Sequence, residues 1–251
     1  MLQKTNLKNI YIILMEPREA GNIGACCRAM KNMGITRLRL VNPVPYLVPE
    51  TFMFCCGADE VIHSSETFTD LHSAVADLDY TIGATRRKGK DRNPVYWIDE
   101  ALPSISAHSQ KNKVGIVFGR EDKGLFNEEL QLCQMQISIP TRRDFPTLNL
   151  AQSVLLVCYE LFLTKHPPDK TTLRLISHTR LTSLLAHIKS TLRLLGYRKQ
   201  GGHDLPRRIL NGLNRIFGRS GLEERDVQMI HGLCSQIEMN QIERKQIKEK
   251  K

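Results

Sequence analysis

Hydrophobic residues in the first two thirds of the chain fall into short continuous runs, a pattern typical of strands buried on both faces of a parallel sheet. The runs lie at residues 10–15, 38–41, 80–83, 114–118 and 136–139. Helical spacing is found between them, at 25–33, 49–57, 70–76 and 99–107. Strands that alternate with helices predict an α/β fold, a parallel sheet flanked by helices on both faces.

Two details of these elements are expected from side-chain type. Met53, Phe54 and Cys55 are closely spaced apolar residues and are predicted to lie in the core. Asn127, ahead of two glutamates, is predicted to cap a short helix, because carboxylates suit the positive end of a helix dipole. The segment 16–24 reads as a loop that leads into the first helix.

The last run of the sheet is followed by an unusual connection. Pro140 ends the strand, since proline has no N–H to donate, and Asn149 with Gln152 forms a capping box ahead of an apolar run that reaches residue 163. Apolar residues cover more than one stripe of this helix, which predicts burial on several sides or a subunit contact. The loop between strand and helix lies at a strand's carboxyl end, where α/β sheets usually bind ligands.

Residues 166–170 break the alternation with two prolines and charged residues, so we place a domain boundary there and predict domains at 1–165 and 166–251. The second part shows only helical patterns, at 173–195, 206–217 and 223–242. We therefore expect a small all-α C-terminal extension.

Charge is distributed unevenly along the chain, whose formal net charge is +10. Residues 1–165 carry 19 Lys and Arg against 18 Asp and Glu, whereas residues 166–251 carry 17 against 8. A neutral domain joined to a strongly basic one favours a polyanionic partner, nucleic acid above all. The alternative is a solvated helical surface that happens to be basic.

Several kinds of chemistry lack their motifs. The seven cysteines include no C-x-x-C pair, so we expect reduced, mostly buried thiols, and the eight histidines show no metal-ligand spacing. Phosphate-loop, dinucleotide-binding, zinc-protease and serine-hydrolase motifs are absent. The apolar run at 10–15 is too short to span a membrane, and we expect a metal-free cytoplasmic protein.

Three segments remain that carry a recognisable order. They are 21–30 (GNIGACCRAM), 117–125 (VFGREDKGL) and 139–151, which begins Ile-Pro and ends Thr-Leu-Asn-Leu-Ala. In this order and spacing they resemble the three motifs of the SPOUT superfamily of RNA 2′-O-methyltransferases, in its SpoU branch, over residues 8–163. The C-terminal stretch is similar to the helical extension of bacterial tRNA cytidine/uridine 2′-O-methyltransferases that act at position 32 of the anticodon loop.

The resemblance implies a trefoil knot formed around residues 119–150, a homodimer, and S-adenosylmethionine held mainly by backbone groups. It implies a tRNA substrate; the alternatives are ribosomal RNA, another tRNA position, or an RNA-binding homologue without catalysis. The positions that match the family's cofactor site are Ala84, Thr85, Arg86, Gly119, Ile139, Pro146, Thr147 and Leu148.

The resemblance also implies catalytic roles for Arg28, Asn22, Thr147 and Asn149. A guanidinium is a poor base because it stays protonated, so we expect Arg28 to anchor a phosphate and stabilise the developing alkoxide. Asn22 would orient the ribose. Thr147 stands where the family more often has Ser, and Asn149 either caps its helix or shapes the site. Without its motif, Arg28 would read as a solvated surface residue.

Basic residues near the predicted site are candidates for contacts with RNA phosphates. They are Arg87, Lys88, Arg120, Arg142 and Arg143, with Arg207 and Arg208 in the extension. Two alternatives stay open at this point: Arg120 and Glu121 only pair across a tight turn, or Arg142 and Arg143 only keep their loop soluble.

Overall fold

A computed structural model describes residues 3–86, 94–166, 173–198 and 204–249. The chain divides into two compact units, Met1–Leu173 and Arg174–Lys251. The division falls a few residues after the boundary predicted at residue 165. That residues 1–165 and 166–251 are independent domains stays a prediction.

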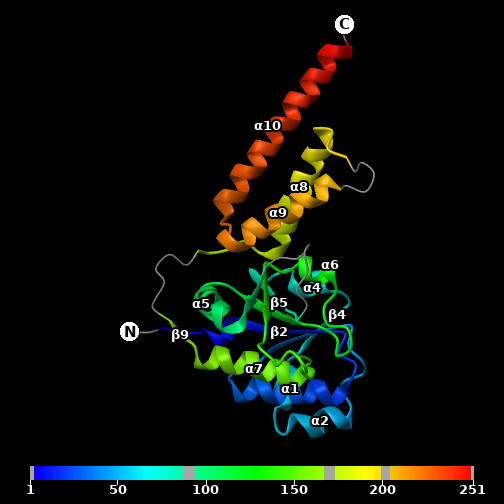
Figure 1. Ribbon diagram of the computed structural model, residues 1–251. Coiled ribbons are helices and arrows are strands. Elements are labelled where there is room, and N and C mark those ends of the chain that lie inside the picture. Colours follow the sequence, from blue (N-terminus) through cyan, green and yellow to red (C-terminus); the bar gives the residue numbers. More distant parts are fainter. Residues whose placement is uncertain (1–2, 87–93, 167–172, 199–203, 250–251) are drawn as a thin grey trace. The chain divides into compact units, whose positions relative to one another are not determined.

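The first unit is built on a seven-stranded sheet (Figure 1). Its order is β4 (Glu66–Phe68), β3 (Arg37–Val41), β2 (Ile10–Met15), β7 (Val114–Phe118), β5 (Tyr80–Ala84), β8 (Met135–Ser138) and β6 (Val95–Trp97). Every pairing in it among the described residues is parallel, which confirms the α/β prediction. The two short outer strands, β4 and β6, have no long apolar run and were not predicted.

The strand order decides where loops meet. β5 pairs with β7 on one side, with Ile82 opposite Ile116, and with β8 on the other, with Ala84 opposite Ile137. Since all three strands run in the same direction, the loops that follow Ala84, Phe118 and Ser138 emerge together at one edge of the sheet. The knot implied for residues 119–150 stays a prediction.

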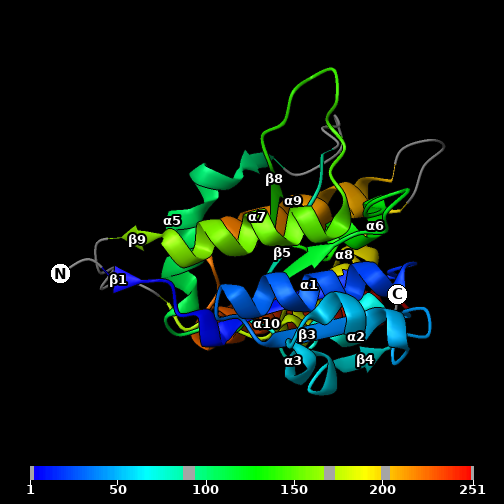
Figure 2. The same cartoon turned by 90° about the horizontal axis from the view of Figure 1, so that it is seen from below.

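Helices cover both faces of the sheet. They are α1 (Ala20–Asn32), α2 (Pro49–Cys55), α3 (Asp59–His63), α4 (Leu71–Val75), α5 (Ile98–Ser109), α6 (Asn127–Gln131) and α7 (Leu150–Leu163). α1 and α7 lie side by side on one face (Figures 1 and 2). On the other face, residues of α4 and α6 such as Val75 and Leu130 pack with Ile13 and Val117 in one core cluster.

Helix α1 begins earlier than its residues suggest. Ala20–Gly24 were predicted to be loop, but they form its first turn and are buried. The reason is packing against α2, because a Cβ built at Gly24 would lie 2.1 Å from the carbonyl oxygen of Thr51. Glycine therefore lets the two helices approach closely, and tertiary contact outweighs its low helix propensity.

Two other predictions are wrong. Met53 and Phe54 are exposed, with 66% of Met53 accessible, and only Cys55 of that group is buried. α2 is a short surface helix that buries one side only. Asn127 does not cap α6; the cap residue is Phe126, whose backbone N–H donates to the Glu129 carboxylate at 2.7 Å.

The remaining elements of the first unit are short. A 3-10 turn, η1 (Leu7–Asn9), precedes β2, and β1 (Gln3–Lys4) pairs antiparallel with β9 (Lys165–His166). These two strands tie the beginning of the unit to the segment after α7.

The second unit consists of α8 (His178–Leu194), α9 (Leu205–Ser220) and α10 (Glu224–Glu249), as the helical pattern predicted. α8 begins at His178 rather than near 173, because the Ser177 side chain accepts the N–H of Arg180 as a cap. Leu184 and Val227 are fully buried between the helices. Among the described residues, no helix is both long enough and apolar enough to cross a membrane.

Candidate active site

A pocket opens at the carboxyl edge of the sheet, between the loops that follow β5, β7 and β8 and the start of α7. All eight residues predicted to hold the cofactor line it: Ala84, Thr85, Arg86, Gly119, Ile139, Pro146, Thr147 and Leu148. They come from three segments far apart in the sequence. Their role toward a cofactor stays a prediction, but the structure brings them around one space.

Gly119 lies where the chain folds back on itself. A Cβ at this position would lie 2.1 Å from the carbonyl carbon of Gly124 and 2.3 Å from the nitrogen of Leu125. The turn is closed by a hydrogen bond from the Gly124 N–H to the Arg120 carbonyl at 2.9 Å, and Gly124 has φ +64°. A side chain at 119 would therefore force the pocket floor apart.

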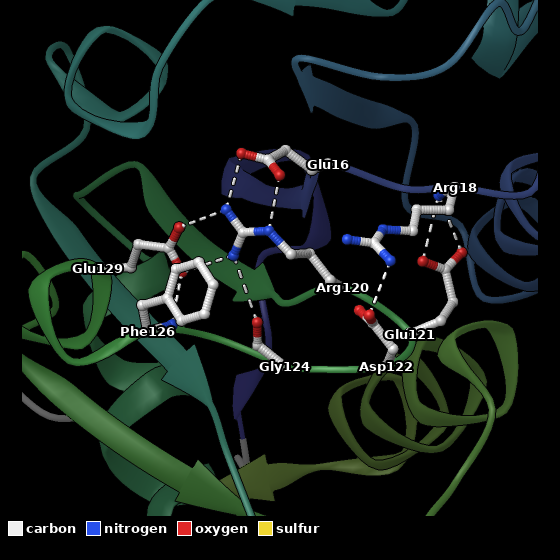
Figure 3. A network of polar contacts seen from close by, with 8 residues as sticks. All are labelled: Glu16, Arg18, Arg120, Glu121, Asp122, Gly124, Phe126 and Glu129. Atoms are coloured by element: carbon white, nitrogen blue, oxygen red, sulfur yellow. Dashed lines mark hydrogen bonds and ion pairs between the residues drawn. The ribbon is translucent and has the colours of Figure 1, made fainter.

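The Arg120 side chain fixes this turn through a network of polar contacts (Figure 3). Its Nε and Nη2 donate to the Glu16 carboxylate at 2.7 Å each, and Nη1 and Nη2 donate to Glu129 at 3.1 and 2.9 Å. The Phe126 ring lies 4.2 Å from the guanidinium carbon. The hydrogen bond to Glu16 is the main reason that the pKa of Arg120 is raised, and the same bond lowers the pKa of Glu16.

These contacts correct the prediction made for Arg120. Only 5% of the residue is exposed, and its donors are used by two carboxylates from other elements, so it is not available to RNA phosphates. The simple pairing with Glu121 is wrong as well. Arg120 is a structural link between the ends of β2 and β7 and helix α6.

A second set of polar contacts joins Glu121, which lines the pocket, to Asn22 and Asn149, which do not. The Asn22 amide donates to Glu121 Oε1 at 3.2 Å, and the Asn149 amide donates to Asn22 Oδ1 at 2.9 Å. Asn149 Oδ1 meanwhile accepts the Ala151 N–H at 2.8 Å. The capping role predicted for Asn149 is confirmed, because its oxygen caps α7. Its nitrogen joins α7 to α1, and a role in shaping the site stays a prediction.

Glu121 was not predicted as a site residue. It lines the pocket, accepts from Asn22, and accepts the Arg18 N–H at 3.1 and 3.2 Å, while the Arg18 side chain pairs with Asp122 (Figure 3). The signal that could have found it was its place in the second motif, beside Gly119 and Arg120. A carboxylate at this rim can accept a hydrogen bond from a ribose hydroxyl.

Arg28 is exposed on α1, two turns beyond Asn22, and it is not among the residues that line the pocket. Six residues of helix separate the two by roughly 9 Å along the axis. Its Nη1 contacts Cys56 Sγ at 3.3 Å, where α2 ends. Within one chain, Arg28 therefore lies outside the pocket, against the end of α2.

The other predicted RNA contacts lie at the surface or outside the described residues. Arg142 and Arg143 are exposed in the loop before α7, and Arg142 pairs with Asp144 at 3.1 Å. Arg207 and Arg208 are exposed on α9 of the second unit. Arg87 and Lys88 fall in a segment that the structure does not describe.

No cysteine is found among the described residues that line the pocket. The seven cysteines are free, and all except Cys56 are buried; burial raises the pKa of Cys158 to about 12, so this thiol stays protonated. The described residues contain no group of three or more His, Cys, Asp or Glu that could hold a metal ion.

Comparison with known proteins agrees with this architecture. Residues 9–159 match the SpoU rRNA Methylase family, and residues 179–250 match the family described as tRNA methyltransferase TrmJ, C-terminal domain. The chain belongs to the SpoU methylase family, as its three motifs predicted. The match covers the whole parallel sheet and the pocket at its edge.

Individual relatives extend over nearly the full length. The chain is 34% identical over 232 residues to an Escherichia coli protein named uncharacterized tRNA/rRNA methyltransferase LasT, covering 92% of this chain and 98% of that protein. It is 32% identical over 240 residues to the tRNA (cytidine/uridine-2′-O-)-methyltransferase TrmJ of Photorhabdus laumondii, covering 92% and 98%. The crystal structure of TrmJ from Z. mobilis superposes with a TM-score of 0.76 at 30% identity, covering 91% and 98%.

Proposed function

We propose that this protein transfers a methyl group from S-adenosylmethionine to a ribose 2′-oxygen of tRNA, at the cytidine or uridine of position 32. The observation that carries the proposal is the pocket itself, where the eight family cofactor positions surround one space. Glu121 also lines this space and is joined to Asn22, which in turn accepts a hydrogen bond from Asn149. Similarity to TrmJ in both units supports the choice of tRNA.

The residues present suit a nucleoside bound largely through backbone groups. Backbone N–H and C=O groups in the loops around Ile139 and Leu148 can form hydrogen bonds with adenine. Gly119 has no side chain, so its backbone can lie close to the backbone of Gly124 and to a bound ligand. When bound there, the cofactor supplies an electrophilic methyl group. The protein's own work is to place the hydroxyl and ease loss of its proton.

Glu121 and Asn22 are the groups that would place the ribose. Asn22 is fixed by Glu19 at 2.9 Å and by Asn149 at 2.9 Å, so its amide is held in one orientation at the rim. We assign Arg28 to the RNA phosphate, with electrostatic stabilisation of the alkoxide that develops on the 2′-oxygen. Thr147 lines the pocket and retains the hydroxyl that the family's Ser would offer.

A substitution on α1 tests this assignment. Arg28→Ala should lower kcat at least a hundredfold, roughly the range found when one stabilising donor is removed, while the protein stays folded and binds S-adenosylhomocysteine normally. Lys31→Ala, an exposed cation one turn further along the same helix, is the matched control and should retain activity. Near-normal turnover of Arg28→Ala would refute the role of Arg28.

We further propose a homodimer that uses α7. Five large apolar residues on its outer side are 39–51% exposed: Leu155, Leu156, Tyr159, Phe162 and Leu163. A contiguous apolar patch of this kind marks an interface, and it accounts for the wide apolar stripe seen in the sequence. Sedimentation should show a dimer that Tyr159→Glu weakens; a monomeric wild-type protein would contradict the proposal.

A second candidate is methylation of ribosomal RNA or of another tRNA position. It is favoured by the names of relatives that do not decide between tRNA and rRNA, and by the family description itself. Mapping of ribose methylation in a strain that lacks the protein separates these substrates. A tRNA substrate also implies a cytoplasmic location, which fractionation would test.

An RNA-binding protein without catalysis would keep the fold and the basic surfaces but would not need the pocket. Calorimetry with S-adenosylmethionine distinguishes this case cheaply, because we expect binding at the pocket that Gly119 helps to form. Absence of binding by folded protein would favour the non-catalytic alternative.

A further inference from the structure

The loop between β8 and α7 carries an exposed aromatic residue. Phe145 is 79% exposed, more than any other large apolar residue recorded as exposed in the described part of the chain. Figure 2 shows this connection rising clear of the sheet and of the helices around it. A side chain this exposed contributes nothing to the core.

The position of Phe145 relative to the pocket is defined by its neighbours. Thr141, Pro146 and Thr147 line the pocket, but Phe145 does not. Phe145 is two residues from Thr147, so their Cα atoms lie within about 7 Å of each other. Phe145 is therefore adjacent in the chain to residues that line the pocket, but it is not itself part of the space proposed for the cofactor.

The loop around the ring is cationic and polar. Arg142 and Arg143 are exposed, and the Arg142 ion pair with Asp144 lies at the surface, where such pairs contribute little. An aromatic face beside guanidinium groups is the combination that binds single-stranded RNA: the ring stacks on an unstacked base and the cations contact phosphates.

Resting on the function proposed above, we propose that Phe145 stacks on an unpaired nucleobase beside the ribose that enters the pocket. The contact is not selective for one base, because every base has a π face. It selects instead for a target nucleotide in a loop, whose bases can be splayed out, over one in a helix. Phe145 is thus a substrate-positioning residue for the RNA.

Three substitutions in the full-length protein test this contact. Phe145→Ala and Phe145→Leu remove the ring, the second while keeping apolar bulk, and each should raise the Kd for an unmodified tRNA transcript about tenfold, equivalent to about 1.4 kcal/mol. Phe145→Trp keeps a stacking face and should bind like the wild type. The Kd for S-adenosylhomocysteine, measured by calorimetry, should stay within about twofold in all three.

A spectroscopic readout reports the stack directly. 2-Aminopurine placed next to the target nucleotide should be quenched by the wild-type protein and by Phe145→Trp, and much less by Phe145→Leu. Unchanged RNA affinity in Phe145→Ala overturns the proposal. A loss of cofactor affinity in that variant would instead identify a cofactor contact, and a changed sedimentation coefficient a contact with a second copy, and either result also overturns it.

RNA affinity is measured without turnover, so the two proposals can fail separately. If the wild type binds tRNA through Phe145 but transfers no methyl group, the proposed function fails and the stacking contact stands. If the wild type methylates tRNA and all three variants match it in RNA affinity, the stacking contact fails alone.

Discussion

At the scale of single residues, the pocket depends on one position without a side chain. Gly119→Ala would place a Cβ about 2.1 Å from backbone at Gly124, a contact that only a shift of the turn can relieve. We expect destabilisation by roughly 1–3 kcal/mol, as for other overpacked sites, and at least a tenfold loss of affinity for S-adenosylhomocysteine.

The control for that substitution is Gly212→Ala on α9, where a Cβ meets nothing within 4 Å. It should leave cofactor affinity unchanged and raise helix stability slightly. Calorimetry and urea unfolding measure both effects. Normal cofactor binding by Gly119→Ala would show that the turn is not part of the site.

A second residue-scale prediction concerns acid stability. Partial burial raises the pKa of Asp77, but hydrogen bonds from Arg39 and Lys113 outweigh it and lower that pKa from 3.8 to about 2. Because the folded pKa lies below the unfolded one, the carboxylate stabilises the fold above about pH 4, and this stabilisation is lost as the pH falls through about 2.

Asp77→Asn should therefore unfold more easily at neutral pH, by at most about 1 kcal/mol because the side chain is 49% exposed and screened by solvent. The difference from wild type should vanish toward pH 2. Denaturant titrations at several pH values provide the measurement. A difference that is constant with pH would show that Asp77 acts through packing and not through its charge.

The roles of some single residues could not be predicted from the sequence. The motif positions located the pocket, but Arg120 was assigned to RNA because its charge was visible and its partners Glu16 and Glu129 were not. Those carboxylates lie 104 and 9 residues away in sequence, and only the fold brings them together. Glu121 lies in the second motif, but nothing in the sequence linked it to Asn22 of α1, 99 residues away.

At the scale of elements, Asn149 at the start of α7 both caps this helix and joins it to α1. Asn149→Ala removes both the cap of α7 and the link to Asn22, so we expect a loss of roughly 1–2 kcal/mol in unfolding free energy together with reduced kcat. Asn149→Ser keeps a capping oxygen, but its side chain is shorter and has no amide nitrogen to donate to Asn22. It should recover stability and leave kcat low.

Equal activity of Asn149→Ser and wild type would show that Asn149 serves only as a cap. Stopped assays under saturating cofactor, beside urea unfolding curves, separate the two effects. This design isolates the role of the nitrogen from that of the oxygen within one side chain.

Element prediction succeeded where local signals were strong. The buried strands and the capping box at Asn149 could be read directly, because apolar runs and cap residues act over a few positions. The start of α1 could not, since Gly24 is helical only through its contact with Thr51 of α2. The short strands β4 and β6 depend on neighbours in the sheet for their hydrogen bonds.

At the scale of the whole molecule, positive charge is concentrated in the last third of the chain. Residues 166–251 carry 17 Lys and Arg against 8 Asp and Glu, and we expect them to bind tRNA phosphates. Replacing Arg207 and Arg208 by Gln should weaken tRNA binding and make the slope of log Kd against log salt shallower by about 1–2. Lys4→Gln is a control on the first unit and should leave the slope unchanged.

An unchanged salt slope in the double variant would remove α9 from the RNA surface. Salt titrations of tRNA affinity by filter binding provide the data. The excess of basic residues in the extension could be counted in the sequence. That Arg207 and Arg208 are exposed is known only from the structure, in which α9 packs its apolar side against the other helices.

The central claim is that the pocket at the carboxyl edge of the sheet directs methyl transfer to a ribose in tRNA. It is tested most directly by incubating the full-length protein with an unmodified tRNA transcript and S-adenosylmethionine, then mapping the product by nuclease digestion and mass spectrometry. We predict one 2′-O-methylated pyrimidine, at position 32, that is absent with Arg28→Ala. A methyl group on a base, or no transfer to tRNA by folded wild-type protein, would contradict the account.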